Sequence, residues 1–139
     1  ILKESINAEE KLNFFIEEVK SKYNLENSKI CISGFSQGCM LSINLGLILK
    51  DAFNCIVGFS GKIIDKENLN TRIQSKTKML LIHGDQDEVV PSYHLLEAKD
   101  FLIRNKINVE TNMIKNCGHH ISVEASSLAL NYIKKNLYI

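Results

Sequence analysis

The sequence lacks the charge excess and the long apolar runs that mark several functional classes. Its 17 lysine and arginine residues are balanced by 16 aspartate and glutamate residues, for a formal net charge of +1. Without a basic excess, binding to nucleic acid has no electrostatic support. No apolar stretch is long enough to cross a bilayer, and no positively charged leader with an apolar core stands at the start. We therefore expect no nucleic-acid partner and no stable membrane insertion.

Proline is scarce, and the cysteines lack any paired pattern. There is one proline, and the four cysteines (Cys31, Cys39, Cys55 and Cys117) form no C-x-x-C pair and no metal-ligand spacing with the histidines. Each cysteine lies in or beside an apolar run, where a free thiol acts as a small hydrophobic side chain. We expect no disulfide framework, no metal site and a reducing, cytoplasmic environment.

The length and composition fit one globular domain. The 139 residues are 45% hydrophobic and 24% charged, which is enough apolar material for one core and shows no bias towards disorder. We expect a single domain over residues 1–139. The chain opens on Ile1 rather than methionine and runs almost at once into a helical pattern, which is also what a fragment of a longer protein would show.

The apolar spacing alternates between the periods of helices and of strands. Asn7 followed by glutamates two and three residues later is typical of a helix N-cap, and short apolar runs bounded by glycine indicate buried strands. Residues 62–76 are polar and predict an irregular surface excursion. The alternation predicts an α/β fold with a mainly parallel sheet and helices on both faces. We expect helices from the cap at residue 7 to 23 and over 36–49, 92–105 and 123–137, and strands over 29–33, 52–60, 78–83 and 109–114.

Gly34-Phe35-Ser36-Gln37-Gly38 forms a G-x-S-x-G pattern between a predicted strand and a predicted helix. A turn this sharp forces strained dihedral angles on its central residue, so small residues are needed two positions before and after it. The turn raises the Ser36 hydroxyl above the sheet, where the backbone N–H of Gln37 can point at the oxyanion of a tetrahedral intermediate. Ser36 is therefore the candidate nucleophile and Gln37 the candidate oxyanion-hole donor. The alternative is a glycine-rich turn that contains a serine by chance.

The loop after the third predicted strand contains two aspartates before Pro91 opens the next helix. An acid just past the end of a later strand can orient a histidine and stabilise its imidazolium form. Asp87 lies further out in the loop, where its side chain can turn back over the sheet. Asp85, directly after Gly84, is better placed to bond the amides of the loop. We favour Asp87 over Asp85 and expect Glu88 to face solvent.

Two adjacent histidines, His119 and His120, follow the fourth predicted strand. A general base must lie on a loop near the top of the sheet and, in this fold, downstream of the acid. Either histidine can serve, and His119 is the better candidate because Gly118 leaves room for its imidazole to approach the serine. His83, which closes a buried strand, is interpreted as a hydrogen-bonded structural residue, and His94 as a helix residue without a partner.

These motifs resemble those of the phospholipase/carboxylesterase family, which includes the acyl-protein thioesterases and small bacterial carboxylesterases. The resemblance rests on residues 34–38, on Phe59-Ser60-Gly61, on residues 83–91 and on Gly118-His119. It covers nearly the whole chain, and Gln37 after the nucleophile is more particular to this family than the bare motif. It implies an α/β-hydrolase-type three-layer sandwich in which these residues form the C-terminal portion.

The resemblance also implies an activity. It predicts a serine hydrolase, of the carboxylesterase, acyl-protein thioesterase or lysophospholipase kind, that cleaves esters or thioesters through Ser36, His119 and Asp87 without a metal or organic cofactor. Its partner is then an acylated substrate, and a homodimer is allowed because family members often dimerise. Family domains contain further N-terminal strands and a His-Gly loop that supplies the second oxyanion donor, and no such loop precedes Ser36 here.

Two other interpretations remain open at this point. The chain can be a truncated, catalytically inactive remnant that keeps the motifs without a working site. It can also carry a different α/β-hydrolase activity, such as that of a dienelactone hydrolase or a serine peptidase. Those enzymes commonly have cysteine as the nucleophile or carry a lid domain, whereas this chain has Ser36 and only the short excursion over residues 62–76.

Overall fold

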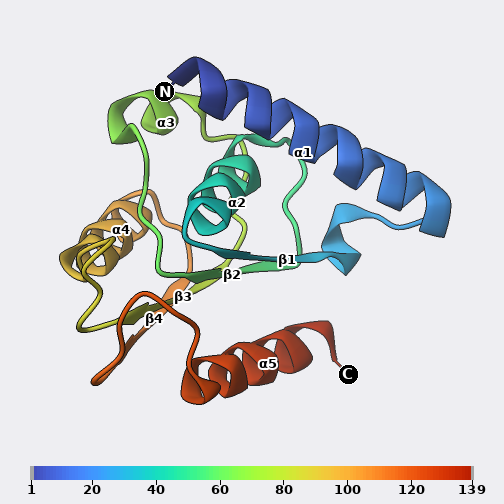
Figure 1. Ribbon diagram of the computed structural model, residues 1–139. Helices are drawn as coiled ribbons and strands as arrows, with labels where there is room; N and C mark the ends of the chain where they lie inside the picture. The colour runs from blue at the N-terminus through green and yellow to red at the C-terminus, as the bar shows by residue number, and fades with distance from the viewer. Residues whose placement is uncertain (1, 139) are drawn as a thin grey trace.

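The computed structural model describes residues 2–138, in which helices and strands alternate (Figure 1). A 3-10 turn, η1 (Asn27–Lys29), precedes the first strand. The strands are β1 (Cys31–Phe35), β2 (Cys55–Phe59), β3 (Met79–Gly84) and β4 (Val109–Ile114). The helices are α1 (Leu2–Tyr23), α2 (Gln37–Ile48), α3 (Lys66–Arg72), α4 (Tyr93–Arg104) and α5 (Val123–Leu137).

The four strands form one parallel sheet in the order β1-β2-β3-β4. Every residue of β2 and β3 is buried, because these central strands are covered on both faces. This explains why their sequences are continuous apolar runs rather than alternating ones. The predicted α/β fold with a parallel sheet is therefore confirmed.

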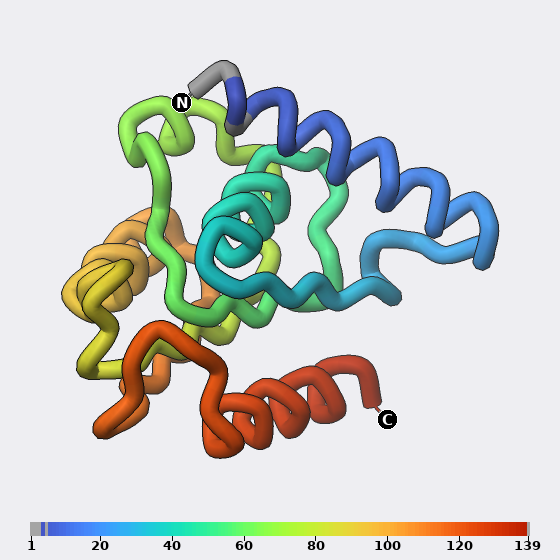
Figure 2. The backbone as a smooth tube through the Cα atoms, viewed as in Figure 1, coloured from blue at the N-terminus to red at the C-terminus, as the bar shows by residue number. Residues whose placement is uncertain are grey.

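Helices cover both faces of the sheet, as predicted, and Figures 1 and 2 show α5 on one side and the remaining helices on the other. Successive strand residues point to opposite faces. Ile56 packs with α2 and α4, whereas its neighbours Cys55 and Val57 pack with α5. Helix α1 lies outside α2 and contributes Ile16 to a smaller cluster with Leu45 and Phe53.

Two local predictions were wrong. Helix α1 begins at Leu2, so Asn7 lies inside the helix instead of capping it. Residues 62–76 are not wholly irregular, because they contain α3, whose N-cap Asp65 accepts a hydrogen bond from the N–H of Asn68. The single buried side chain of α3, Leu69, anchors this short helix to the core. One buried apolar residue in seven is too weak a signal for the periodicity of a helix.

The edge strand β1 is more exposed than the central strands. Within residues 2–138, β1 pairs only with β2, so its other edge is not paired by any described strand. The residues of β1 are correspondingly half-buried or exposed, unlike those of β2. Over the same residues, no helix has the length and apolar character that crossing a membrane requires.

Candidate active site

Ser36 lies on a strained turn between β1 and α2. Its dihedral angles, φ 54° and ψ −114°, fall in a region that side-chain-bearing residues rarely adopt. A Cβ on Gly34 would lie 2.3 Å from the carbonyl carbon and oxygen of Gly38, so only glycine fits at that position. A Cβ on Gly38 would meet nothing within 4 Å of the described atoms. The expected need for small residues on both sides therefore holds for Gly34 and not for Gly38.

A backbone hydrogen bond to the neighbouring strand fixes the position of Ser36 at the end of the sheet. Its N–H donates to the carbonyl of Phe59 at 2.8 Å, which continues the β1–β2 pairing by one residue. Helix α2 begins at the next residue, Gln37, and the first N–H groups of a helix have no acceptor within the helix. Ser36 therefore lies at the carboxyl end of the sheet, next to the backbone N–H of Gln37, which has no acceptor within the helix.

Asp87 lies in the loop between β3 and α4, and its side chain is fully buried. Its Oδ1 accepts hydrogen bonds from the N–H groups of Val89 and Val90, at 2.9 and 2.8 Å. Its Oδ2 lies 2.7 Å from Nδ1 of His119. Burial alone would raise the pKa of Asp87, but the hydrogen bonds from His119, Val90 and Val89 outweigh it and hold the pKa below its usual value. Asp87 is thus an ionised carboxylate that points at His119.

His119 links the other two residues. Its Nε2 lies 3.0 Å from Oγ of Ser36, while its Nδ1 faces Asp87. The Asp87 carboxylate can only accept a hydrogen bond. The tautomer assigned from this network therefore carries its hydrogen on Nδ1 and leaves Nε2 free to accept a hydrogen bond from the Ser36 hydroxyl. The ring also packs against Phe35, with centroids 4.8 Å apart and planes inclined by 43°. The structure thus brings together Ser36, His119 and Asp87 from three loops.

The neighbouring candidates take other places. Oδ1 of Asp85 faces the N–H of Cys117 at 3.4 Å, where it ties two loops together, and Glu88 is exposed. His120 is exposed and lies 3.7 Å from the Cys117 sulfur through Nε2. We expected glycine at position 118 to make room for the His119 imidazole, and this was wrong. A Cβ on Gly118 would make only ordinary contacts at 3.8 Å or more.

The interpretation of His83 as a hydrogen-bonded structural residue is confirmed, but its contact with Asp87 was not foreseen. His83 is 1% exposed, its Nε2–H donates to the carbonyl of Val90 at 2.7 Å, and the same nitrogen lies 3.4 Å from Oδ2 of Asp87. His83 thereby braces the loop that holds the carboxylate. His83 and Asp87 are four residues apart in sequence, which could have suggested a contact. Whether they meet depends on the conformation of the loop between them, which the sequence does not give. His94 does have neighbours, Tyr93 and Glu97, contrary to expectation.

A groove of about 690 Å³ lies between α1 and the first turns of α2, next to Gln37. Asn44 lines it and is 6% exposed, and within residues 2–138 its Oδ1 has no hydrogen-bond partner. Such an unpaired buried acceptor is unfavourable and rare in folded proteins. The other lining residues are Glu4, Ala8, Glu9, Gln37, Gly38, Met40, Leu41 and Ile64.

Comparison with known proteins identifies the family. The model of the family described as phospholipase/carboxylesterase matches residues 3–137. The chain belongs to this family. No cluster of three or more histidine, cysteine, aspartate or glutamate side chains suited to a metal ion occurs in the described part of this family member.

Relatives of the chain are esterases and thioesterases. Acyl-protein thioesterase 1 of Yarrowia lipolytica is 32% identical over 117 residues, which are 79% of this chain and 51% of that protein. The crystal structure of esterase PE8 is 32% identical with a TM-score of 0.93, and the match covers 96% of this chain and 62% of that one. The Bacillus cereus carboxylesterase, at 18% identity and a TM-score of 0.80, shares the fold. The chain spans about half the length of the curated relatives it matches.

Gly84 provides a test of how the site is held. A Cβ at Gly84 would lie 2.2 Å from the carbonyl oxygen of Cys117 and 2.6 Å from that of Gly118, so the loop carrying His119 would have to shift. We expect Gly84→Ala to lower the free energy of unfolding by about 1–3 kcal/mol, as overpacking typically does. Gly118→Ala, which meets only ordinary contacts, should change it by less than about 0.5 kcal/mol. Urea unfolding curves measure both, and equal losses in the two variants would contradict this geometry.

Proposed function

We propose that this chain carries the nucleophile, base and acid of a serine hydrolase that cleaves carboxylic esters or acyl thioesters. The observation that carries the proposal is the unbroken line from Asp87 through His119 to Ser36, with contacts of 2.7 and 3.0 Å. Family membership supports the same chemistry, since relatives of the chain include acyl-protein thioesterases and esterases. That the whole protein acts on an ester or a thioester is likewise proposed.

In the proposed reaction His119 takes the proton of Ser36 as Oγ attacks the acyl carbonyl. The imidazolium that forms is stabilised by the buried carboxylate of Asp87, which the Val89 and Val90 amides hold in place. His119 then passes its proton to the departing alcohol or thiol. Water hydrolyses the acyl-enzyme with His119 again acting as the base. None of these steps requires a metal or an organic cofactor.

The oxyanion of the tetrahedral intermediate needs hydrogen-bond donors. The backbone N–H of Gln37, at the N-terminus of α2, is the donor that this chain offers. Losing one such donor typically lowers kcat by about 10²–10³. We therefore propose that full activity depends on a second donor from polypeptide beyond these residues, as the resemblance implies.

The groove beside Gln37 is the place where that polypeptide would fit. It adjoins the first donor, and it contains the unpaired acceptor Oδ1 of Asn44. Similar structures contain a further third or so of chain, since the match covers 62% of esterase PE8. An N–H from an added segment would satisfy Asn44 and complete the groove wall.

The first prediction concerns Ser36. In the full-length protein, Ser36→Ala should lower the kcat for p-nitrophenyl ester hydrolysis by about 10⁶, as loss of a serine nucleophile does, because no other described group replaces its hydroxyl next to His119. The control is Ser127→Ala, on an exposed turn of α5, which should keep full turnover. Steady-state kinetics and thermal unfolding of each variant give the result. Equal turnover by Ser36→Ala would refute the assignment, and a folded full-length protein without turnover would favour the inactive alternative.

The second prediction separates the two aspartates. Asp87→Asn should lower kcat by about 10⁴, because an amide cannot hold His119 in the required tautomer. Asp85→Asn should lower it less than tenfold, since Asp85 bonds the N–H of Cys117 and not the histidine. A larger loss with Asp85→Asn than with Asp87→Asn would show that the acid is misassigned.

The third prediction tests the groove. Asn44→Leu should leave the free energy of unfolding of the 139-residue chain unchanged or raise it, because it removes an acceptor without a partner in the described chain. Asn54→Leu is the control, since the half-buried Asn54 donates to the carbonyls of Ser28 and Asn136, and it should lose about 0.5–1.5 kcal/mol. A comparable loss with Asn44→Leu in chemical unfolding would mean that Asn44 already has a partner and that the groove is complete.

A further inference from the structure

Two cysteines meet at the end of the sheet opposite the active site. Cys31 and Cys55 begin β1 and β2, and they are paired in the register of these parallel strands. Their sulfur atoms are 2.8 Å apart, in direct contact. Both side chains point to the face covered by α5, where they belong to the same apolar cluster as Tyr132. Nothing in the proposed hydrolysis uses them.

The backbone geometry allows a bond between the two sulfurs. Neighbouring strands lie about 4.8 Å apart, which is within the range of about 4.4–6.8 Å between the Cα atoms of disulfide-bonded cysteines. Because Cys31 and Cys55 are opposite each other, their Cα atoms take this spacing without movement of either strand. The side-chain torsions that bring the sulfurs into contact are already adopted.

The two thiols differ in access. Cys31 is half-buried, so part of it remains open to a small reagent, whereas Cys55 has no exposed surface. Burial, followed by the neighbouring Cys31, raises the pKa of Cys55 to about 12, although the positive charge of Lys78 opposes this. At neutral pH Cys55 is therefore a protonated thiol held against the sulfur of Cys31.

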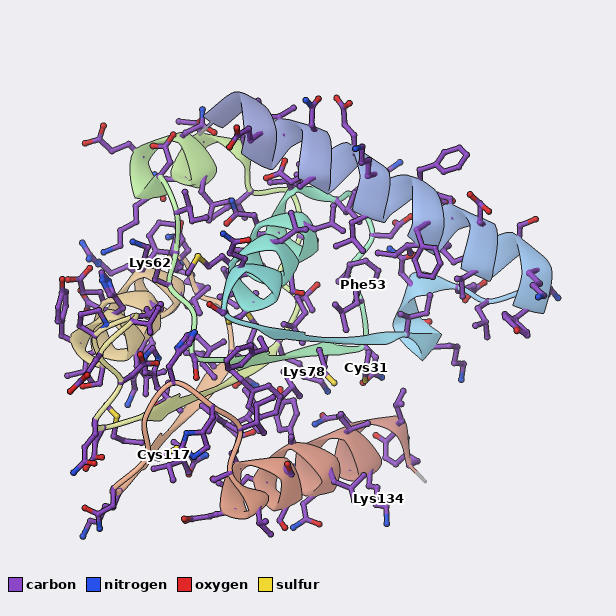
Figure 3. All side chains as sticks on the ribbon, viewed as in Figure 1. Cys31, Phe53, Lys62, Lys78, Cys117 and Lys134 are labelled. Carbon is purple, nitrogen blue, oxygen red and sulfur yellow. The ribbon has the colours of Figure 1, made fainter. Side chains whose placement is uncertain are left out.

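The remaining cysteines are not arranged in this way. Cys39 is buried beneath Gly58 and Gly61, and burial raises its pKa to about 12. Cys117 is buried in the loop before His119, with its sulfur near the ring of His120. Figure 3 shows Cys31 and Cys117 at opposite ends of the sheet. Among the described contacts, Cys31 and Cys55 are the one pair of sulfurs that touch.

We propose that Cys31 and Cys55 form a modification site at which hydrogen peroxide converts two thiols into a reversible disulfide between β1 and β2. The Cys31 sulfur attacks one oxygen of the peroxide, the O–O bond breaks, and a sulfenic acid and one water form. The Cys55 sulfur then attacks the Cys31 sulfur, the S–O bond breaks, and the hydroxyl leaves with the Cys55 proton as a second water. The two sulfurs lose two electrons in total, and the peroxide gains them.

This site is independent of the proposed hydrolase activity. It lies at the amino ends of the strands, whereas Ser36, Asp87 and His119 lie beyond their carboxyl ends. Oxidation should therefore cross-link the sheet without altering the contacts between the active-site side chains. The oxidised chain is expected to keep whatever ester turnover the reduced chain has, within about twofold.

The test is thiol counting on the folded chain. After exposure to a small excess of hydrogen peroxide, the denatured product should show two thiols fewer than the four of the reduced chain, an intact mass lower by two hydrogens, and one peptide pair joined through Cys31 and Cys55. Dithiothreitol should restore all four thiols. When oxidised in urea, the same chain should give mixed pairings, because the sheet no longer selects the partner.

Matched variants make the result decisive. Cys117→Ser should still lose two thiols and give the same cross-linked peptides, whereas Cys55→Ser should give none. Retention of all four thiols in the folded wild-type chain would overturn the proposal. So would a disulfide between two molecules, a pairing that involves Cys39 or Cys117, or equal thiol loss in the wild type and Cys55→Ser. None of these readouts depends on catalysis, so failure of the proposed hydrolase function would leave the result interpretable.

Discussion

The hydrogen bonds that continue the sheet by one residue beyond each strand hold the candidate site together. The N–H groups of Ser36, Ser60 and Asp85 donate to the carbonyls of Phe59, Ile82 and Ile114, each on the next strand of the sheet. These bonds set the height of the loops that follow the strands. Because the strands are parallel, the three loops start at the same edge. Ser36 and Asp87, some fifty residues apart in sequence, can then both contact His119.

The buried carboxylate is the electrostatic centre of this arrangement. An isolated charge with no exposed side-chain surface would be strongly unfavourable. Asp87 is stabilised by two backbone amides and by His119, with His83 packed on the same side of the loop. Protonation would weaken these interactions. Since the pKa of Asp87 is lower in the folded chain than its ordinary value, its contribution to stability is present above that ordinary value and is lost as the pH falls through the folded pKa.

The sequence was sufficient for the order of elements and the type of sheet. Buried strands read as continuous apolar runs, and the amphipathic helices α4 and α5 have the spacing of one apolar face. Helix α3 was missed because it buries a single side chain, Leu69, and the start of α1 was misplaced because Asn7 resembles a cap. The sequence also placed Ser36, Asp87 and His119 on loops that follow strands, as the structure has them.

Contacts within the site were harder to predict, because they depend on register and loop conformation. Glu88 faces solvent as expected, but the bracing of Asp87 by His83 and the packing of Phe35 on His119 follow from distances that no motif encodes. The same holds for the groove and its unpaired Asn44, which concern the packing of α1 against α2. A sequence motif gives the residue types of a site, whereas the contacts between their atoms depend on the folded structure.

The most direct test of the account is the site of covalent capture by a fluorophosphonate, which reacts with an activated serine. The folded chain should take up a single adduct, and peptide mass spectrometry should locate it on Ser36, with no adduct after unfolding in urea, where His119 no longer lies 3.0 Å from the hydroxyl. An adduct on another serine, or the absence of any adduct from a demonstrably folded chain, would contradict the assignment of Ser36 as an activated nucleophile.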